Sequence, residues 1–292
     1  MKLLTTSVIR GSSQIECNGG VYLVDLDKQE AQQPIDLNSN AIDWTGRGLE
    51  LGFRGIAFDS DLIYLAASDE LFAYDRSFEK QASWRHPYLK HCRDIRVYER
   101  NLYLVSAGHD TILGFDLDEM VFHWALRVNV QDFVFKSRIF DPDADDGPLR
   151  INKLQLTSVF ADEDGMYIGG RNTGGMLHYN GKTIQMSAEL PAGANDARPF
   201  RDGVLFNDAK SGSVRYVSRE GTEDRALPYP RLNTDKPFGR GLCLLSDHVV
   251  ATGSAPSTIS IHDLKKNETV LKVNLSTDSR SAIHGLEVWP FD

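Results

Sequence analysis

The chain has 292 residues, of which 41% are hydrophobic and 25% charged, a composition that excludes disorder over most of its length. Its net charge of −9 disfavours a nucleic-acid partner, because binding a phosphate backbone requires concentrated lysine and arginine, and it would repel an anionic membrane surface. The short polar start Met1–Arg10 is not typical of a signal peptide, and no apolar run is long enough to span a bilayer. We therefore expect a cytoplasmic protein.

Residues 1–37 predict three strands, over Leu3–Ile9, Gly20–Asp27 and Gln33–Leu37, because β-branched and aromatic residues lie beside glycine turns. A long connection over residues 38–53 follows. The next unit begins at Phe53–Phe58, where a polar residue precedes a short apolar strand. A turn of aspartate and serine and a second apolar strand complete it.

This unit returns at five further places, Cys92–Val97, Leu154–Val159, Asn195–Phe200, Gly239–Leu244 and Ile283–Val288. Most of these anchors are spaced by about 40 to 45 residues, the period of a β-propeller blade. The last anchor lies too close to the C-terminus for a complete blade. The sequence therefore predicts one all-β domain over residues 1–292, a six-bladed β-propeller closed by a C-terminal innermost strand paired with N-terminal outer strands.

Two further connections, about residues 129–153 and 229–238, interrupt the repeat. The first contains Asp141–Gly147, whose alternating aspartates are similar to a calcium loop. The match to an EF-hand fails, because Asp146 and Asn152 stand where glycine and a bidentate glutamate are required. Calcium binding and a solvated acidic loop both remain open.

Propeller ligands usually lie over the central channel, where the innermost strands begin. Aligning the anchors places one polar residue per blade there, namely Arg54, Arg93, Gln155, Asp196, Arg240 and His284. Such a ring is either a set of polar groups that bond one another and trapped water, or a site for an anion, since guanidinium groups bind carboxylate and phosphate bidentately.

In the second interpretation His284 is the candidate acid or base, because its unperturbed pKa suits proton exchange near neutrality. Asp196 or Asp94 would orient it. The turns on the same face add three candidate ligand-binding residues, His91, His109 and Arg171.

A metal site built from His86, His91, His109 and His284 is the rival hypothesis. The spacing does not favour it, because histidine occupies only one position of the predicted ring. The three cysteines, Cys17, Cys92 and Cys243, lack the spacing of a zinc or redox motif and are interpreted as structural thiols. We predict neither a metal nor a cofactor.

The anchors resemble those of six-bladed propellers of the NHL, gluconolactonase and strictosidine-synthase type, and more closely a family of uncharacterised bacterial propeller proteins. The resemblance rests on Arg54–Phe58, Ala197–Asp208, Phe238–Leu242 and His284–Val288. In those relatives the resemblance implies histidines near the fourth and fifth innermost strands, where this chain has Gln155 and Asn195-Asp196. It also lacks the gluconolactonase calcium ligand at a matching position, so lactonase activity is not implied.

Two functions follow as hypotheses. The first is an isomerase or lyase acting on a small anionic substrate held by arginines. The second is a non-catalytic module that binds a protein partner, because aromatic residues are frequent in the connections, at Trp44, Phe133, Phe135, Phe140, Tyr229 and Phe238. The sequence leaves the oligomeric state open.

Overall fold

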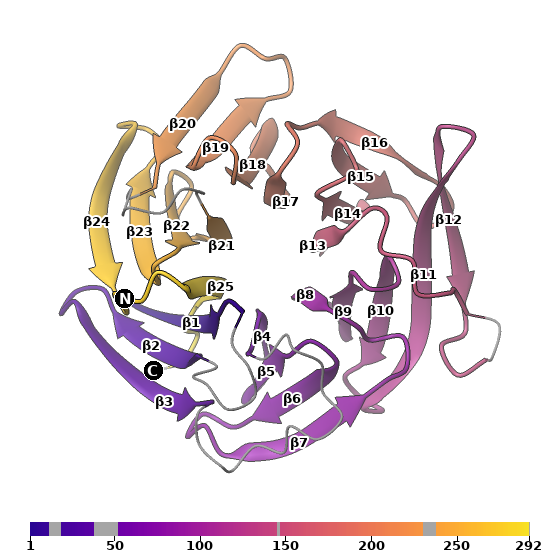
Figure 1. The fold of residues 1–292 in the computed structure, drawn as a ribbon, viewed down its shortest axis with the longest axis horizontal. Helices are drawn as coiled ribbons and strands as arrows, with labels where there is room; N and C mark the ends of the chain where they lie inside the picture. Colours follow the sequence, from indigo (N-terminus) through magenta and orange to yellow (C-terminus); the bar gives the residue numbers. More distant parts are fainter. Residues whose placement is uncertain (12–18, 38–51, 145–146, 230–237, 292) are drawn as a thin grey trace.

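The computed structural model describes residues 1–11, 19–37, 52–144, 147–229 and 238–291. Six small antiparallel sheets surround a central axis (Figure 1). This arrangement confirms the predicted six-bladed β-propeller. The described residues form strands and turns, and they include no helix long and apolar enough to cross a membrane.

Five sheets are built from consecutive strands, listed from the innermost outward. The first holds β4 (Gly55–Asp59), β5 (Leu62–Ala66), β6 (Glu70–Tyr74) and β7 (Lys80–Arg85). The second holds β8 (Cys92–Tyr98), β9 (Asn101–Ser106), β10 (Thr111–Asp116), β11 (Val121–Gln131) and β12 (Val134–Phe140). The third holds β13 (Leu156–Asp162), β14 (Gly165–Gly170), β15 (Gly175–Tyr179) and β16 (Ile184–Glu189). The fourth holds β17 (Ala194–Phe200), β18 (Gly203–Asp208), β19 (Ser213–Ser218) and β20 (Asp224–Pro228). The fifth holds β21 (Gly239–Leu244), β22 (Val249–Ser254), β23 (Thr258–Asp263) and β24 (Glu268–Asn274).

The sixth sheet joins the two ends of the chain (Figure 1). Its innermost strand is β25 (Ser281–Val288), followed outward by β1 (Lys2–Ile9), β2 (Gly20–Asp25) and β3 (Glu30–Asp36). Strands β25 and β1 are antiparallel, with Thr5 opposite Leu286, and the backbone of Trp289 adds a hydrogen bond to Lys2 beyond the strand. This pairing converts two chain ends into one complete blade and removes two sheet edges.

The core consists of apolar layers between neighbouring blades. One layer combines Tyr64 and Leu71 of the first blade with Leu104 and Phe115 of the second, all buried. Because each sheet is covered on both faces, its middle strands are apolar on both sides and do not alternate with polar residues. Strand β6 shows this pattern, since all its residues are buried.

The second blade differs from the prediction, because the expected connection over residues 129–153 contains the end of β11 and the whole of β12. The two strands are joined by Asp132 and Phe133, both at positive φ, with Gln131 opposite Val134. A two-residue loop with positive φ at both positions forms a tight hairpin. The sequence reading missed it because such loops usually carry glycine or asparagine.

The joint between the closing blade and the first blade has no room for a side chain at Gly285. A Cβ atom there would lie 2.3 Å from the carbonyl oxygen of Arg54 and 2.7 Å from the hydroxyl of Thr6. We therefore expect Gly285→Ala to lower the free energy of unfolding by about 2–3 kcal/mol, measured by urea denaturation. The matched control is Gly181→Ala, where φ is +87° and no atom lies within 4 Å of the new Cβ. It should lose only the backbone cost of about 1 kcal/mol, and equal losses in both variants would refute close packing at this joint.

Candidate functional site

A cavity of about 250 Å³ lies at the channel end where the innermost strands begin. Five residues predicted from the sequence line it, which are Arg54, Arg93, Arg171, Arg240 and His284. They come from five different blades. Arg54 precedes β4, Arg93 and Arg240 lie near the starts of β8 and β21, Arg171 follows β14, and His284 is in β25. We call this cavity the arginine mouth.

Five further residues line the cavity that were not predicted as ligand-binding, and two of them, Arg10 and Phe238, carry side chains that contact the mouth. The Arg10 guanidinium lies 5.0 Å from the centre of the Phe238 ring and donates a hydrogen bond of 2.8 Å to the carbonyl of Ser279. The Phe238 ring is 5.4 Å from that of His284. Arg10 comes directly after β1, the strand that pairs with the innermost strand β25, so the predicted ring closure contained a signal for it.

His284 is buried and contacts Arg54. The Nη1 atom of Arg54 lies 3.2 Å from Nδ1 of the imidazole and 3.5 Å from Nε2. Because a guanidinium only donates, the closer ring nitrogen must accept, and the ring proton then lies on Nε2. Burial lowers the pKa of His284 well below its usual range, and the charges of Arg54, Arg240, Arg93 and Arg171 lower it further. The imidazole is therefore neutral and presents an N–H group.

Arg240 is only 3% exposed. Burial lowers its pKa to about 9, Asp196 acts in the opposite direction, and the other arginines of the mouth lower it further. Its buried Nη1 atom has no hydrogen-bond partner among the residues that the structure describes. An unsatisfied buried donor is costly, so this atom marks a place where a hydrogen-bond acceptor would be favourable.

Asp94 and Asp196 were predicted to stand beside His284, but neither lines the arginine mouth. They line a second hollow deeper in the channel, together with Glu287 and two arginines, Arg96 and Arg198. The side chain of Arg96 lies 3.8 Å from that of Glu287. This hollow holds about 10 Å³, enough for roughly one water molecule. Glu287 was missed because its neighbours in β25 gave no polar pattern to single it out.

The position of Asp196 follows from a bulge in β17. The register shifts between Asn195 and Arg198, and Asp196 has a φ of 53°. Its carboxylate accepts a hydrogen bond of 2.8 Å from the side chain of Asn207, whose own oxygen accepts one from the buried hydroxyl of Tyr229. This network holds the carboxylate of Asp196, whose negative charge acts on Arg240 and raises its pKa.

Three other predicted ligand residues lie outside the arginine mouth. His91 contacts Arg150, with 2.6 Å between Nε2 and Nη2, and Nδ1 of His109 is 3.3 Å from the carbonyl oxygen of Pro148. Gln155 has a φ of 52° and accepts the backbone hydrogen bond of Arg171 through its carbonyl. His91 and His109 therefore do not line the arginine mouth, and both contact the segment that follows β12.

No group of three or more histidine, cysteine or acidic side chains is arranged to hold a metal within the described ranges. In the acidic loop that is similar to a calcium loop, Asp141 accepts a hydrogen bond from the backbone of Asp143, and Asp143 lies 3.8 Å from His86. Residues 145–146 lie outside the described residues, so the calcium hypothesis is untested. Cys92 and Cys243 are buried thiols, and Cys17 lies outside the described residues.

The aromatic residues of the predicted protein-binding loops divide into distinct groups. Phe140 and Tyr229 are 7% and 5% exposed and belong to the core, so they give no support to a binding surface. Trp44 lies outside the described residues. Phe133, at the tip of the β11–β12 hairpin, is fully exposed.

No protein-family model matches the chain, and no curated protein matches it. Many solved structures are similar to it. A chain of the nidogen/laminin complex has a TM-score of 0.65 at 12% identity, over 98% of both chains. A protein of unknown function from Bacteroides caccae has a TM-score of 0.64 at 11% identity, over 98% of this chain and 97% of that one. A catalytically inactive histidine-to-alanine variant of virginiamycin B lyase from Staphylococcus aureus, with quinupristin, has a TM-score of 0.50 at 9% identity, over 78% of this chain and 71% of that one.

At these identities the likeness shows the fold alone. The six-bladed propeller is supported, whereas the resemblance to NHL-type or uncharacterised bacterial propellers is not confirmed by any family match.

Asp94 makes the stability of the protein depend on pH. Burial raises its pKa to about 7, and the charge of Asp196 adds to the rise. An unfolded aspartate has a pKa of about 3.9, so the folded state binds the carboxyl proton of Asp94 more tightly than the unfolded state does. The stability that this proton contributes is lost as the pH rises from about 4 through 7. We expect the stability of Asp94→Asn relative to the wild type to improve by about 2 kcal/mol between pH 5 and pH 8, measured by urea unfolding.

The readout is the change with pH, since asparagine alters the hydrogen bond from Val159 at every pH. Histidines buried in the neutral form, such as His284, give a slope of opposite sign below about pH 6.5, but they are present in both proteins and cancel in the difference. A difference that stays constant from pH 5 to pH 8 would show that Asp94 is already ionised throughout this range.

Proposed function

We propose that the arginine mouth binds a small anion that carries two or more negative charges. The observation that carries this proposal is Arg240, which is buried among other arginines and has an Nη1 donor without a partner within the described residues. The positive charges of Arg93, Arg171 and Arg54 help to lower the pKa of Arg240, so they repel its guanidinium. An anion would relieve that repulsion and accept hydrogen bonds from several guanidinium groups together.

The size and chemistry of the cavity favour a compact ligand. Its volume of about 250 Å³ is slightly below the usual range for drug-sized ligands, and its polar lining suits a di- or tricarboxylate or a phosphate. The N–H of neutral His284 would add a donor that does not depend on charge. Phe238 would cover one side of the bound molecule, since its ring lies beside the imidazole.

Catalysis is the more specific form of this proposal. In the free protein burial, together with the charges of the arginines, keeps His284 neutral, and Arg54 occupies its accepting nitrogen. A bound anion would offset those charges and raise the pKa of His284, so that the imidazole could exchange a proton with the ligand, as in an isomerase or lyase. One solved propeller of similar fold is a lyase that a histidine-to-alanine change inactivates.

The first test is a thermal-shift titration at constant ionic strength. We expect citrate to raise the melting temperature with a saturable midpoint, because a ligand that binds only the folded state stabilises it by mass action. Acetate at equal ionic strength should give a much smaller shift. Arg240→Gln and Arg171→Gln should each weaken citrate binding about tenfold or more, since each removes a charge-assisted contact.

The matched control is Arg76→Gln, an exposed arginine far from the mouth that pairs with Asp61. It should bind citrate like the wild type. The proposal fails if citrate, phosphate and acetate give the same small shift, or if Arg76→Gln loses as much affinity as Arg240→Gln. His284→Asn should bind citrate within about threefold of wild type, because it removes no charge.

The β11–β12 hairpin favours a second function, the binding of a protein partner. Phe133 is 101% exposed and has a φ of 63°, a conformation that is costly for an aromatic residue. Val130, Val134 and Ile139 are about half exposed nearby. Exposed aromatic and aliphatic groups at one tip are typical of an interaction site, and a structurally similar propeller was solved in the nidogen/laminin complex.

Replacing Phe133 by glycine tests whether the fold needs this side chain. We expect the free energy of unfolding to stay the same or rise by up to about 1 kcal/mol, because glycine adopts positive φ without strain and no packing is lost. The control Phe135→Ala, on the face of the hairpin that packs against the third blade, should cost about 2 kcal/mol or more. A loss above about 1 kcal/mol in Phe133→Gly would assign the ring a structural role and remove the motive for the docking function.

A further inference from the structure

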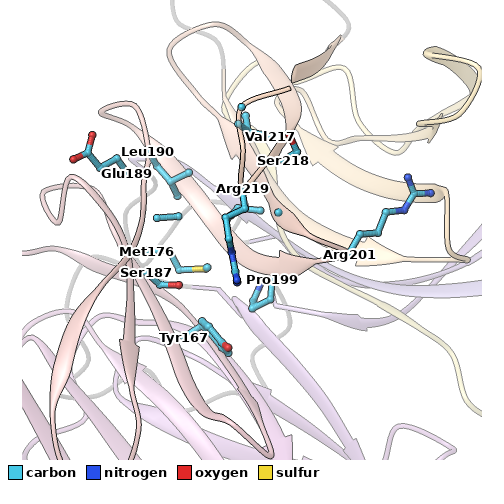
Figure 2. Close-up of a pocket in the computed structure, with 14 residues that line it drawn as sticks. Tyr167, Met176, Ser187, Glu189, Leu190, Pro199, Arg201, Val217, Ser218 and Arg219 are labelled. Carbon is cyan, nitrogen blue, oxygen red and sulfur yellow. The ribbon is translucent and has the colours of Figure 1, made fainter. Parts of the chain in front are cut away.

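A further cavity lies away from the channel and from both hollows described above, between the third and fourth blades (Figure 2). It measures about 410 Å³ and is lined by residues of β14 to β19 and of the turns beside them. This volume falls within the range of pockets that bind small molecules, about 300–1,000 Å³. The cavity shares no lining residue with the arginine mouth. A ligand here would be independent of the function proposed above.

The walls of this inter-blade cavity are mostly apolar. Met176 and Val204 are buried in the layer between the two blades, and Leu190 and Val217 pack against that layer. Pro199 forms part of the wall opposite Met176 (Figure 2). Such walls would bind a hydrocarbon or aromatic body, because each Å² of apolar surface removed from water contributes about 25 cal/mol of binding free energy.

A single cation is directed into this apolar space. Arg219 extends from the end of β19, and its guanidinium lies between Met176 and Pro199, above Tyr167 (Figure 2). Its backbone N–H is bonded to the carbonyl of Asp202, which fixes the root of the side chain. No hydrogen bond or ion pair joins the guanidinium to another side chain in the ranges that the structure describes.

Tyr167 supplies a polar group beside this cation. Burial raises the pKa of its phenol, and the charges of Asp162 and Asp164 raise it further. The positive charge of Arg219 lowers it, so the guanidinium lies close enough to act on the hydroxyl. The ring stacks on His178 at 4.6 Å between centroids, so its orientation is fixed. Together the two side chains offer a charged and a neutral donor at the same end of the cavity.

The other charged groups of the rim do not compete for this place. Arg201 is directed away from the cavity in Figure 2, and its guanidinium donates to the carbonyl oxygen of Asp247 at 2.6 Å. Glu189 lies at the opposite rim and points outward. Asp202, whose backbone carbonyl bonds the N–H of Arg219, accepts the hydrogen bond of the Tyr216 hydroxyl with its carboxylate. The cavity is therefore apolar at one end and cationic at the other.

We propose that the inter-blade cavity is a binding site for an amphipathic monocarboxylate, with the carboxylate on Arg219 and Tyr167 and the apolar body against Met176, Val204 and Leu190. Charge complementarity with Arg219 selects an anion over an amine or an alcohol. The apolar walls select a hydrocarbon or aromatic body over a compact polyanion, which is the ligand class that the arginine mouth favours.

The test uses octanoate as the probe, with 1-octanol and octylamine as its neutral and cationic counterparts, in isothermal titration of the full chain below the micellar concentration. We expect octanoate to bind with one-to-one stoichiometry, 1-octanol at least fivefold more weakly and octylamine not measurably. Arg219→Gln should weaken octanoate about tenfold and leave 1-octanol unchanged, because it removes only the charge-assisted contact.

Three variants make the result specific. Arg201→Gln, at the same rim but bonded to Asp247, should bind octanoate like the wild type. Ala188→Phe should fill the cavity and abolish binding, with the circular dichroism melt confirming that the variant is folded. Arg240→Gln, in the arginine mouth, should leave octanoate binding intact.

Absence of saturable octanoate binding would overturn the proposal. So would equal losses in Arg201→Gln and Arg219→Gln, or equal affinities for octanoate and 1-octanol, because both would show that Arg219 does not select the ligand. Displacement of octanoate by citrate, or its loss in Arg240→Gln, would place the bound molecule in the arginine mouth instead. Should Ala188→Phe fail to fold, the contrast between Arg219→Gln and Arg201→Gln decides the matter alone.

Discussion

The pairing of β1 with β25 is the constraint on which the channel depends. Thr6, in β1, accepts a hydrogen bond of 2.8 Å from the backbone of Gly285 and donates one of 3.0 Å to the carbonyl of Arg54. One buried hydroxyl thus connects the N-terminal strand, the C-terminal strand and the entry to the first blade. The contact between Arg54 and His284 exists because this junction brings residues from opposite ends of the chain together. Without closure, the sheets would expose two edges and the channel would have no defined end.

Charge is separated along the channel, and burial determines the consequences. At the mouth, burial and the charges of neighbouring arginines lower the pKa of Arg240 and of His284. Deeper in the channel, burial raises the pKa of Asp94, Asp196 and Glu287. A buried charged form of any of these side chains would be more stable beside a group of opposite charge. Asp196 is such a group for Arg240 from beneath, held by Asn207 and Tyr229. From above, the described residues supply no acceptor to the Nη1 atom, and this asymmetry favours a ligand on the open side.

The fold could be predicted from the sequence because the same strand pattern recurs in every blade. All six anchors became innermost strands, and Gly239–Leu244 coincides with β21 at both ends. The directions of the side chains could not be predicted, because several innermost strands carry bulges. The extra residue of a bulge redirects a side chain. The bulge around Asp196 directs its carboxylate to the side chain of Asn207. Spacing alone also missed β12, since an aromatic residue at Phe133 gives no turn signal.

The inter-blade cavity could not be predicted from the repeat. A repeated strand pattern predicts the blades, but it does not show how completely side chains fill the space between neighbouring blades. The layer between the first and second blades contains sixteen buried apolar residues, whereas that between the third and fourth contains five, two of them the alanines Ala194 and Ala197. Alanine leaves space that leucine would fill, and a joint packed with small side chains stays open on its outer side. Empty apolar volume is unfavourable, because lining atoms lose dispersion contacts. A ligand that supplies those contacts, and an anionic group for Arg219, would therefore stabilise the joint between the third and fourth blades.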